Sequence, residues 1–548
     1  MQKNKNSMAL NWINKNTKHI YIKMILLTVL AMIMSVISVG LAWMSKIAID
    51  AAVQRVPAVE LYYKIAGIFI LIVLQVIVQI AYSKINVKTT IKYSITLKEN
   101  LFNRLLKKKW QKVSEYHSGE LLNRINSDIS IITSGVTTII PNVFSLSLRI
   151  ILSFASLFVL DKWLAVVYLA VSPFIFVLTR IYGRGMKALH KKCQETDGKT
   201  KSFMQECLQN LLVIKAYRNQ DKVTKASNKL QLDNLYYNVK RNNISILMNI
   251  VFFMALTAGY YATLSYCAIQ ISAAVMTYGT MMAILQLISS VQVPFKDLSA
   301  LVPQYYGVIA SVERICELEN MPDEQNDLIF EVNWQSIELD NIAFAYDGEH
   351  IFKNANLKFD KGDFLAICGI SGIGKSTLMK LMMGILKPDG GKITILSENN
   401  ADSQDNGKSL FSYVPQGNMI LSGTIKENIA FYSEQDDEKI KKAAKAAELY
   451  DFIETLPDKF ETTLGEKGLG LSEGQIQRLA IARAVYYNAP IILLDEATSA
   501  LDEATEYKLL ENIKELKNKS CIIISHKNAA LSICNKKIAI EAMKITEM

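Results

Sequence analysis

The distribution of hydrophobic residues divides the chain into two parts with different patterns. Residues 1–320 contain six apolar runs, each long enough to cross a bilayer as a helix of about 20 residues. The runs occupy residues 20–44, 61–81, 136–160, 163–181, 244–269 and 274–293. Beyond a charged linker at residues 312–326, short strand-like runs alternate with helical patterns. We therefore predict an all-α, six-helix transmembrane domain over residues 1–320 and an α/β domain over residues 321–548, with a surface loop at 398–406.

Two long polar segments, residues 82–135 and 182–243, interrupt the series of spans. Apolar residues recur at helical spacing in residues 97–106 and 121–132, and glycine and proline are scarce. Both segments are therefore expected to be helical excursions from the membrane rather than disordered loops. A leg of about 20 helical residues reaches about 30 Å, far enough to touch another domain.

Charge predicts the orientation of the spans. The 548-residue chain has a formal net charge of +10, and 50% of its residues are hydrophobic. The first excursion holds ten Lys and Arg against four Asp and Glu, and the second holds thirteen against five. By the positive-inside rule, both excursions, the Lys-rich N-terminus and the α/β domain are expected in the cytoplasm, in a multi-pass protein of the cell membrane. The basic charge thus has an explanation in membrane topology, and nucleic acid is not expected as a partner.

Residues 369–377 form the first predicted nucleotide-binding motif. They read Gly-Ile-Ser-Gly-Ile-Gly-Lys-Ser-Thr and match the phosphate-loop pattern G-x-x-x-x-G-K-[S/T]. A strand-like run precedes them at 364–368, and a helical pattern follows at 375–386, as this motif requires. Lys375 supplies a charge for the β- and γ-phosphates, and the Ser376 hydroxyl is a hard oxygen ligand suited to Mg²⁺. The residues predicted to bind ATP in this loop are Gly369, Ser371, Gly372, Gly374, Lys375, Ser376 and Thr377.

A pair of carboxylates provides the second nucleotide element. Four apolar residues at 491–494 predict a buried strand, and Asp495 and Glu496 follow it directly. Asp495 is suited to hold Mg²⁺ through water, and Glu496 to orient and polarise the attacking water. The α/β domain is therefore predicted to be an ATPase that uses ATP and Mg²⁺.

Six spans with two basic excursions and a phosphate-loop domain resemble an ABC exporter half-transporter, in which a type 1 transmembrane domain is fused to an ABC ATP-binding domain. Bacterial multidrug, peptide and lipid exporters have this organisation. The resemblance implies short coupling helices at the tips of the excursions, around residues 114–120 and 210–217. Residues 462–466 resemble an exporter-specific segment that contacts such helices. The chain ends sooner after residue 526 than is usual in the family, so fewer contacts between nucleotide domains are expected in the open state.

The resemblance also assigns three single residues near the nucleotide. Tyr346 matches the aromatic that stacks on adenine, and Gln416 in Val-Pro-Gln matches the Q-loop glutamine that reaches Mg²⁺ and the attacking water. His526, after the strand-like run at 521–524, matches the switch histidine that contacts the γ-phosphate. The implied catalytic residues are Glu496 and His526, and the implied metal ligands are Ser376, Gln416 and Asp495.

Residues 471–475 read Leu-Ser-Glu-Gly-Gln and resemble the ABC signature Leu-Ser-Gly-Gly-Gln. In the family this segment closes on ATP held by the opposite subunit, so Ser472, Gly474 and Gln475 are expected to bind ATP in trans. A second transporter subunit is therefore the expected partner, with a homodimer favoured and the competent half of a heterodimer left open. Glu473 replaces a glycine, and its side chain is expected to point away from the phosphates.

Polar residues inside the spans are the only indication of substrate. Arg149 lies near the middle of the third span, and Gln75 and Gln79 share one face of the second. An intramembrane arginine usually faces the bundle interior or a wet cavity. Arg149 would then favour an anionic or polar group of the substrate; the alternative is a structural partner elsewhere in the bundle.

The leading function is an ATP-driven exporter of a peptide, drug or lipid that works by alternating access. An importer built on the exporter fold, such as a metal-chelate uptake system, remains an alternative. A non-transporting, ATP-gated membrane sensor is a third possibility. Besides the second subunit, the expected partners are membrane lipid and an unidentified small molecule or peptide.

Overall fold

The computed structural model describes the backbone of residues 2–116, 118–324, 334–346, 348–397, 410–417, 420–465, 468 and 470–548. Side chains are described for these residues apart from some helical positions, most of them in 2–6, 172–191 and 293–302. The predicted surface loop at 398–406, the end of the predicted linker at 325–326 and Glu466 lie outside the described residues.

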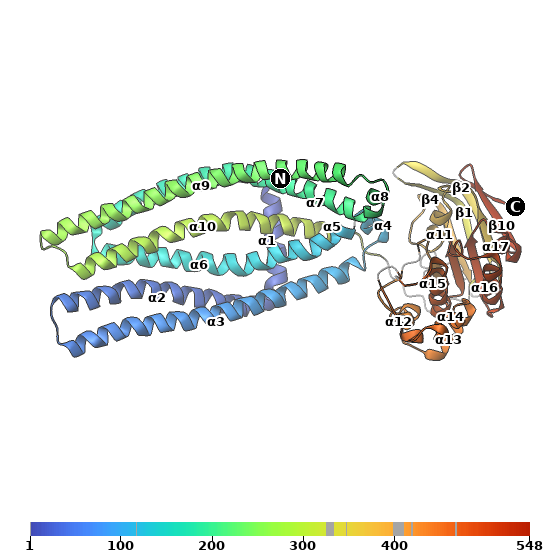
Figure 1. Cartoon of the computed structure of the whole chain (residues 1–548), viewed down its shortest axis with the longest axis horizontal. Coiled ribbons are helices and arrows are strands. Elements are labelled where there is room, and N and C mark those ends of the chain that lie inside the picture. The colour runs from blue at the N-terminus through green and yellow to red at the C-terminus, as the bar shows by residue number, and fades with distance from the viewer. Residues whose placement is uncertain are drawn as a thin grey trace. The chain divides into compact units, whose positions relative to one another are not determined.

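The chain divides into two compact units (Figure 1). The first comprises Met1–Lys107 and Tyr116–Met321, and the second comprises Lys108–Glu115 and Pro322–Met548. The segment Lys108–Glu115 therefore belongs with the second unit, although a single boundary at residue 320 places it in the first. Backbone contacts explain the difference, because the Lys109 N–H donates to the Pro322 carbonyl at 3.0 Å.

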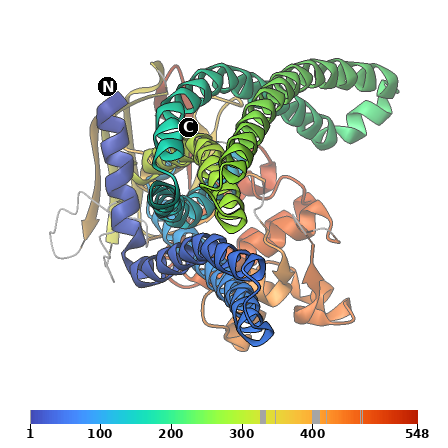
Figure 2. The ribbon, with the colours of Figure 1, turned by 90° about the vertical axis from the view of Figure 1, so that its left-hand side faces the viewer.

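The first unit is helical throughout its described residues. Its helices are α1 (Gln2–Thr17), α2 (Tyr21–Val53), α3 (Ala58–Leu105), α5 (Ser118–Asn123), α6 (Ile129–Leu160), α7 (Lys162–Gln209), α8 (Leu211–Ala216), α9 (Gln220–Ser272) and α10 (Tyr278–Glu319). A 3₁₀ turn, η1 (Lys18–Ile20), joins α1 to α2, and a π-helical turn, η2 (Arg124–Asp128), joins α5 to α6. Helix α1 runs across the direction of the long helices (Figure 2).

The long helices confirm a helical membrane domain, and the described residues account for four of the six predicted spans. Four described helical stretches are long and apolar enough to span a membrane: Ser7–Val53, Ala58–Leu105, Ser118–Leu160 and Gln220–Ser272. The fourth and sixth predicted spans include positions whose side chains are not described, at 172–181 and 293. The sixth span begins at Tyr278 rather than at residue 274, because the Thr277 hydroxyl caps α10 by accepting a hydrogen bond from the Thr280 N–H at 3.1 Å.

The outward faces of these helices are apolar. Only 6% of the most apolar window of α3 is buried within the chain, and Phe69 and Ile70 are about two-thirds exposed at 64% and 66%. In water such a surface would drive aggregation, whereas in a bilayer it meets lipid tails. The exposed apolar surface therefore fits a membrane-embedded unit.

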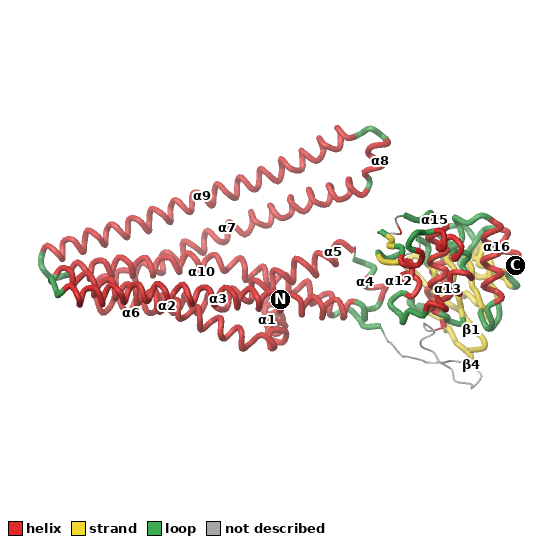
Figure 3. The backbone as a smooth tube through the Cα atoms, turned by 60° about the horizontal axis from the view of Figure 1, so that its bottom comes forward, coloured by secondary structure: helices red, strands yellow, loops and turns green. Residues whose placement is uncertain are grey.

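The tips of the two excursions differ from each other. In the second, α7 and α9 run side by side as two legs, and α8 lies at the turn between them, inside the predicted range 210–217 (Figure 3). In the first, the short helix α4 is Trp110–Val113 and precedes the predicted range 114–120, which instead covers the end of that turn and the start of α5. The coupling role predicted around 114–120 stays a prediction, and Lys109, just before α4, is hydrogen-bonded to Pro322.

In its described residues, the second unit contains three sheets. The largest has the strand order β11-β10-β3-β9-β8-β5, parallel except for the antiparallel pair of β10 and β11. Its strands are β3 (Phe364–Cys368), β5 (Phe411–Val414), β8 (Ile491–Asp495), β9 (Ser520–Ile524), β10 (Lys536–Glu541) and β11 (Lys544–Glu547). A three-stranded sheet joins β1 (Trp334–Tyr346), β2 (Glu349–Asp360) and β4 (Gly390–Ser397), and a small ladder joins β6 (Gly423–Thr424) to β7 (Thr463–Leu464).

Helices pack around the large sheet. They are α11 (Lys375–Met382), α12 (Ile425–Ala430), α13 (Asp437–Ala446), α14 (Tyr450–Thr455), α15 (Glu473–Tyr487), α16 (Glu503–Glu515) and α17 (Asn528–Ile533), with a 3₁₀ turn, η4 (Lys459–Glu461). Helices α12 and α13 pack against α15, and α14 packs against α13. Alternate residues of each buried strand enter opposite cores. Leu365 and Leu493 pack in a core with α11 residues, whereas Ala366 and Leu494 pack in a core with residues of α15 and α16. Burial of both faces explains the continuous apolar runs read from the sequence.

Candidate functional site

The phosphate loop connects β3 to α11 at the carboxyl edge of the large sheet. Gly369, Gly372 and Gly374 have φ values of +141°, +81° and +112°, a region that side-chain-bearing residues rarely adopt. At position 374 a Cβ atom would lie 2.5 Å from Ile351 Cγ2. The glycines therefore permit both the turn and its close packing against β2. Ser371 is exposed in this loop, and Thr377 is half-buried in the first turn of α11.

Lys375 folds back into the loop. Its Nζ donates to the carbonyl oxygens of Gly369 at 2.5 Å and Ile370 at 3.3 Å, and lies 3.1 Å from His526 Nε2. The side chain of Lys375 is buried, although it is charged. The structure thus brings two predicted phosphate-contacting residues together from β3–α11 and from the end of β9.

Asp495 lies beside the first turn of α11. Its side chain is 2% exposed, and its Oδ1 accepts a hydrogen bond from Ser376 Oγ at 2.9 Å. Its Oδ2 accepts one from the Tyr413 hydroxyl, also at 2.9 Å. Burial, and secondarily the charge of Asp495, raise the pKa of Tyr413 far above its usual value, so the hydroxyl remains a donor. Two of the three predicted metal ligands are therefore adjacent.

Glu496 occupies an uncommon backbone conformation. Its φ is +51°, which is rare for a residue with a side chain, and its N–H donates to the Ile524 carbonyl at 3.2 Å. Its Oε2 accepts a hydrogen bond from Gln416 Nε2 at 2.7 Å. The Q-loop glutamine and the predicted water-orienting carboxylate are thus in direct contact, and the amide oxygen of Gln416 remains for another partner.

Tyr346 ends β1 close to the phosphate loop in sequence. The side chain is 37% exposed, and its ring meets that of Phe344 edge-on, with centroids 4.9 Å apart at 89°. An exposed ring held from one side offers a face for stacking on a base. The structure is therefore compatible with the role predicted for this residue.

The signature residues start α15. Ser472 is its N-cap: the hydroxyl accepts from the Gln475 N–H at 3.3 Å, and the Ser472 N–H donates to Gln475 Oε1 at 2.8 Å. A Cβ at Gly474 would lie 3.3 Å from the Ala500 carbonyl oxygen, so this glycine keeps the helix close to the segment after β8. Glu473 is exposed in the first turn, where a negative charge suits the helix dipole. Within the described part of the chain, the side-chain hydrogen bonds of Ser472 and Gln475 are made to each other.

A buried polar network behind these motifs was not predicted. Gln477, 2% exposed, donates to Ser499 Oγ at 2.9 Å and accepts from the Ala500 N–H at 3.0 Å. Lys527 Nζ donates to the Thr498 carbonyl at 3.0 Å, and the Thr498 hydroxyl donates to Glu506 Oε1 at 2.6 Å. Burial raises the pKa of Glu506.

This network links α15, the segment after β8 and the residue after His526. No local pattern marks it, since glutamine, threonine and lysine are common on helices and loops. Tyr413 was also missed. It stands three residues before the Q-loop glutamine, and only strand pairing shows what it meets.

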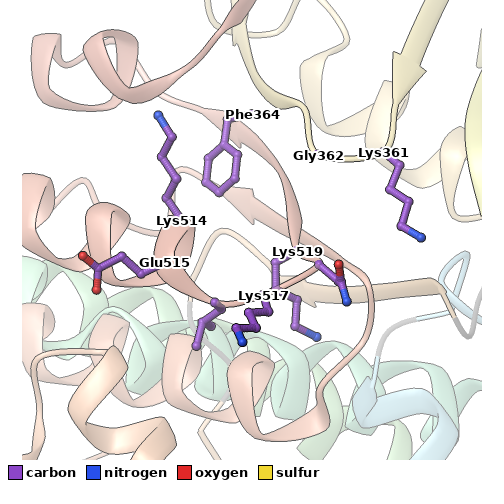
Figure 4. Close-up of a pocket in the computed structure, with 9 residues that line it drawn as sticks. Lys361, Gly362, Phe364, Lys514, Glu515, Lys517 and Lys519 are labelled. Atoms are coloured by element: carbon purple, nitrogen blue, oxygen red, sulfur yellow. The ribbon is translucent and has the colours of Figure 1, made fainter.

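A separate hollow of about 440 Å³ lies at the opposite edge of the large sheet (Figure 4). Lys361 and Phe364 line it from the start of β3, and Lys514, Lys517 and Lys519 line it from the segment before β9. The Lys519 amine donates to the carbonyls of Asn488 and Ala489 at 2.8 and 2.7 Å, and so serves the end of α15. Ligands of parallel α/β sheets bind at the carboxyl edge, where the phosphate loop lies, so this hollow is distinct from the ATP site.

Arg149 lies on α6 in the first unit and is half-buried. Its Nη2 donates to Ser290 Oγ on α10 at 3.2 Å, while its Nε is buried without a hydrogen-bond partner among the described residues. On α3, Gln75 is half-buried and Gln79 is exposed. The three predicted substrate residues therefore differ in burial. Of the three, only Arg149 has a buried hydrogen-bond donor, its Nε, without a partner among the described residues.

Comparison with known proteins agrees with this architecture. The family model described as ABC transporter transmembrane region matches residues 24–295, and the model described as ABC transporter matches residues 352–499. The ATP-dependent lipid A-core flippase of Desulfotalea psychrophila is 30% identical over 457 residues, covering 80% of this chain and 78% of the relative. ABC transporter B family member 1 of Dictyostelium discoideum is 30% identical over 83% of this chain, which spans about half, 51%, of that relative.

One solved structure shows the same fold over nearly the whole length. The chain matches a structure described as a bacterial Atm1-family ABC exporter with ATP bound, with a TM-score of 0.83, 22% sequence identity and coverage of 97% of this chain and 95% of that one. The fused pair of family matches and the flippase relative go beyond fold. This chain therefore belongs to the ABC transporter family, as an ATP-hydrolysing transporter that joins an exporter-type membrane domain to an ABC ATPase domain.

Proposed function

We propose that this protein exports an amphipathic, anionic substrate by alternating access, as a dimer whose ATPase domains lie in the cytoplasm. The observation that carries the ATPase part is the meeting of three pairs of side chains at the carboxyl edge of one sheet. The pairs are Lys375 with His526, Ser376 with Asp495, and Gln416 with Glu496.

The donor set suits Mg²⁺. The Ser376 hydroxyl and the Asp495 carboxylate are hard oxygen ligands with 2.9 Å between Oγ and Oδ1, and Gln416 keeps its amide oxygen free of Glu496. These three residues would hold the ion together with ATP phosphates. Bound there, Mg²⁺ would neutralise charge on the phosphates. The positive charge of Lys375 would stabilise the phosphate chain, and Glu496 would orient the attacking water.

We propose that two chains complete each ATP site, because Ser472, Gly474 and Gln475 form a helix N-terminus suited to a phosphate, with Ser472 exposed and the other two half-buried. A complementation experiment tests this proposal. Lys375→Ala and Ser472→Arg chains carrying different tags are co-expressed in a Glu496→Gln background, and mixed pairs are purified. If sites are shared, one site of each mixed pair has both an intact phosphate loop and an intact signature, so each pair retains about one ATP. Neither variant alone retains any. Absence of ATP from the mixed pairs would mean that each chain builds its own site.

For the substrate, we propose a lipid with an anionic head group. Arg149 supports this choice, because a buried guanidinium nitrogen without a partner is costly in a membrane and can be satisfied by a phosphate or carboxylate. Among the relatives, several are named ATP-dependent lipid A-core flippases. Asp297, an acidic residue on α10, is the competing structural partner for Arg149.

The transport test uses the full chain in vesicles with ATP supplied on one side. Export predicts that fluorescent phosphatidylglycerol moves away from the leaflet that faces the ATPase domain, and that phosphatidylcholine moves less. Arg149→Ala should abolish the preference for the anionic lipid. If Arg149 only balances Asp297, then Arg149→Ala and Asp297→Ala should lower thermal stability alike and leave lipid preference per folded molecule unchanged. Movement in the reverse direction would indicate import.

A further inference from the structure

Both carboxylate oxygens of Asp495 are held by hydroxyl groups. Ser376 Oγ donates to Oδ1 and Tyr413 Oη donates to Oδ2, each at 2.9 Å. The proposed function gives roles to Ser376 and Asp495, but none to Tyr413. A buried carboxylate with two donors has its orientation decided by both of them.

Strand register explains why Tyr413 reaches this carboxylate. Strands β5 and β8 are parallel, with Tyr413 opposite Leu493, and Asp495 lies two residues beyond Leu493 on the same sheet face. Diagonal neighbours of this kind are within reach of an aromatic side chain. The Tyr413 ring packs against the core on the α11 side of the sheet. This packing fixes the ring and therefore the position of its hydroxyl group.

The same strand end contacts the second carboxylate as well. Gln416, three residues after Tyr413, donates to Glu496 Oε2 at 2.7 Å. The stretch 413–416 thus touches Asp495 at one end and Glu496 at the other. A displacement of this stretch changes the surroundings of both carboxylates together.

We propose that Tyr413 is a positioning residue for the metal that accompanies ATP. Its hydroxyl holds Oδ2 of Asp495 and leaves Oδ1, on the side of Ser376, as the oxygen that serves the metal. The inference rests on the proposed role of Asp495 and Ser376 as Mg²⁺ ligands. A carboxylate rotates broadly about its last torsion, so a fixed donor on one oxygen narrows the positions of the other. Removing such an outer partner typically weakens metal affinity by about 10–100-fold.

The test measures how much Mg²⁺ tightens nucleotide binding. The full-length protein carries Glu496→Gln to prevent hydrolysis, and the affinity for a fluorescent ATP analogue is measured in excess Mg²⁺ and in excess EDTA. In Tyr413→Phe, which keeps the ring, the ratio of the two affinities should fall about tenfold, with the affinity in EDTA unchanged. Tyr507→Phe on α16, whose side chain is 45% exposed, is the matched control and should leave the ratio unchanged.

Two results would overturn the inference. One is a ratio within twofold of the parent protein, and the other is an equal loss of affinity in Mg²⁺ and in EDTA, which indicates a structural role. If Tyr413→Phe does not fold, Tyr413→Leu must show the same loss. Asp495→Asn tests the assignment of Asp495 as a Mg²⁺ ligand, on which this inference rests. If Asp495→Asn keeps the parent ratio of affinities in Mg²⁺ and EDTA, that assignment is wrong. If Asp495→Asn loses the ratio while Tyr413→Phe keeps it, only the role of Tyr413 fails.

Discussion

Replacing Gly374 by alanine should disable nucleotide binding, because the phosphate loop is packed tightly at this point. The new Cβ would lie 2.5 Å from Ile351 Cγ2 and 3.2 Å from Phe352 Cζ, and the backbone φ is +112°. Ile351 is β-branched and Phe352 is fully buried, so neither side chain can withdraw freely. The loop must therefore change its shape to accept the methyl group.

The magnitude follows from two contributions. An unfavourable φ for a residue with a side chain costs about 1–3 kcal/mol. Forcing a methyl group into a packed site costs about 1–3 kcal/mol more. A loss of about 2 kcal/mol, the lower end of the sum, corresponds to about thirtyfold in affinity.

The assay is the affinity of the purified full chain for a fluorescent ATP analogue, measured beside its melting temperature. Gly384→Ala is the matched control, because Gly384 also has a positive φ, +67°, but a Cβ there meets nothing within 4 Å. That control should lower stability by about 1 kcal/mol and leave nucleotide affinity unchanged. If Gly374→Ala binds the analogue within twofold of the parent protein, the packing argument is refuted.

Three further outcomes are expected. Glu496→Gln should trap ATP and stabilise a closed dimer, which gel filtration would detect. Normal ATP hydrolysis by this variant would show that Glu496 is not the residue that activates water. Glu473→Gly should change ATP turnover by less than about tenfold, since the Glu473 side chain is exposed at a helix start, and a larger rise would show that this carboxylate opposes closure. Arg149→Ala should reduce stimulation of ATPase activity by anionic lipid while basal activity persists, whereas unchanged stimulation would exclude Arg149 from the substrate path.

Sequence alone predicted the features that depend on contiguous residues. The apolar runs predicted membrane helices because the thickness of the bilayer core sets the length of apolar helix needed to cross it. The phosphate loop was recognisable because its glycines serve a local backbone shape, seen at Gly374. Likewise, the buried strand at 491–494 and the carboxylates after it form a short unit, and its place at the sheet edge follows from parallel strand geometry.

Tertiary structure decided which side chains meet. Tyr413 reaches Asp495 because β5 is paired with β8 in one register, and neither strand order nor register is encoded in a local pattern. The short helix Trp110–Val113 follows Lys109, which is hydrogen-bonded to Pro322, more than 200 residues away, and no local pattern predicts that contact. The hydropathy pattern showed that Arg149 lies within a predicted span. Only the packing of α6 against α10 showed that its Nη2 is hydrogen-bonded to Ser290, while its Nε has no partner in the described chain. Contacts between distant segments depend on how whole elements pack, which local periodicity does not contain.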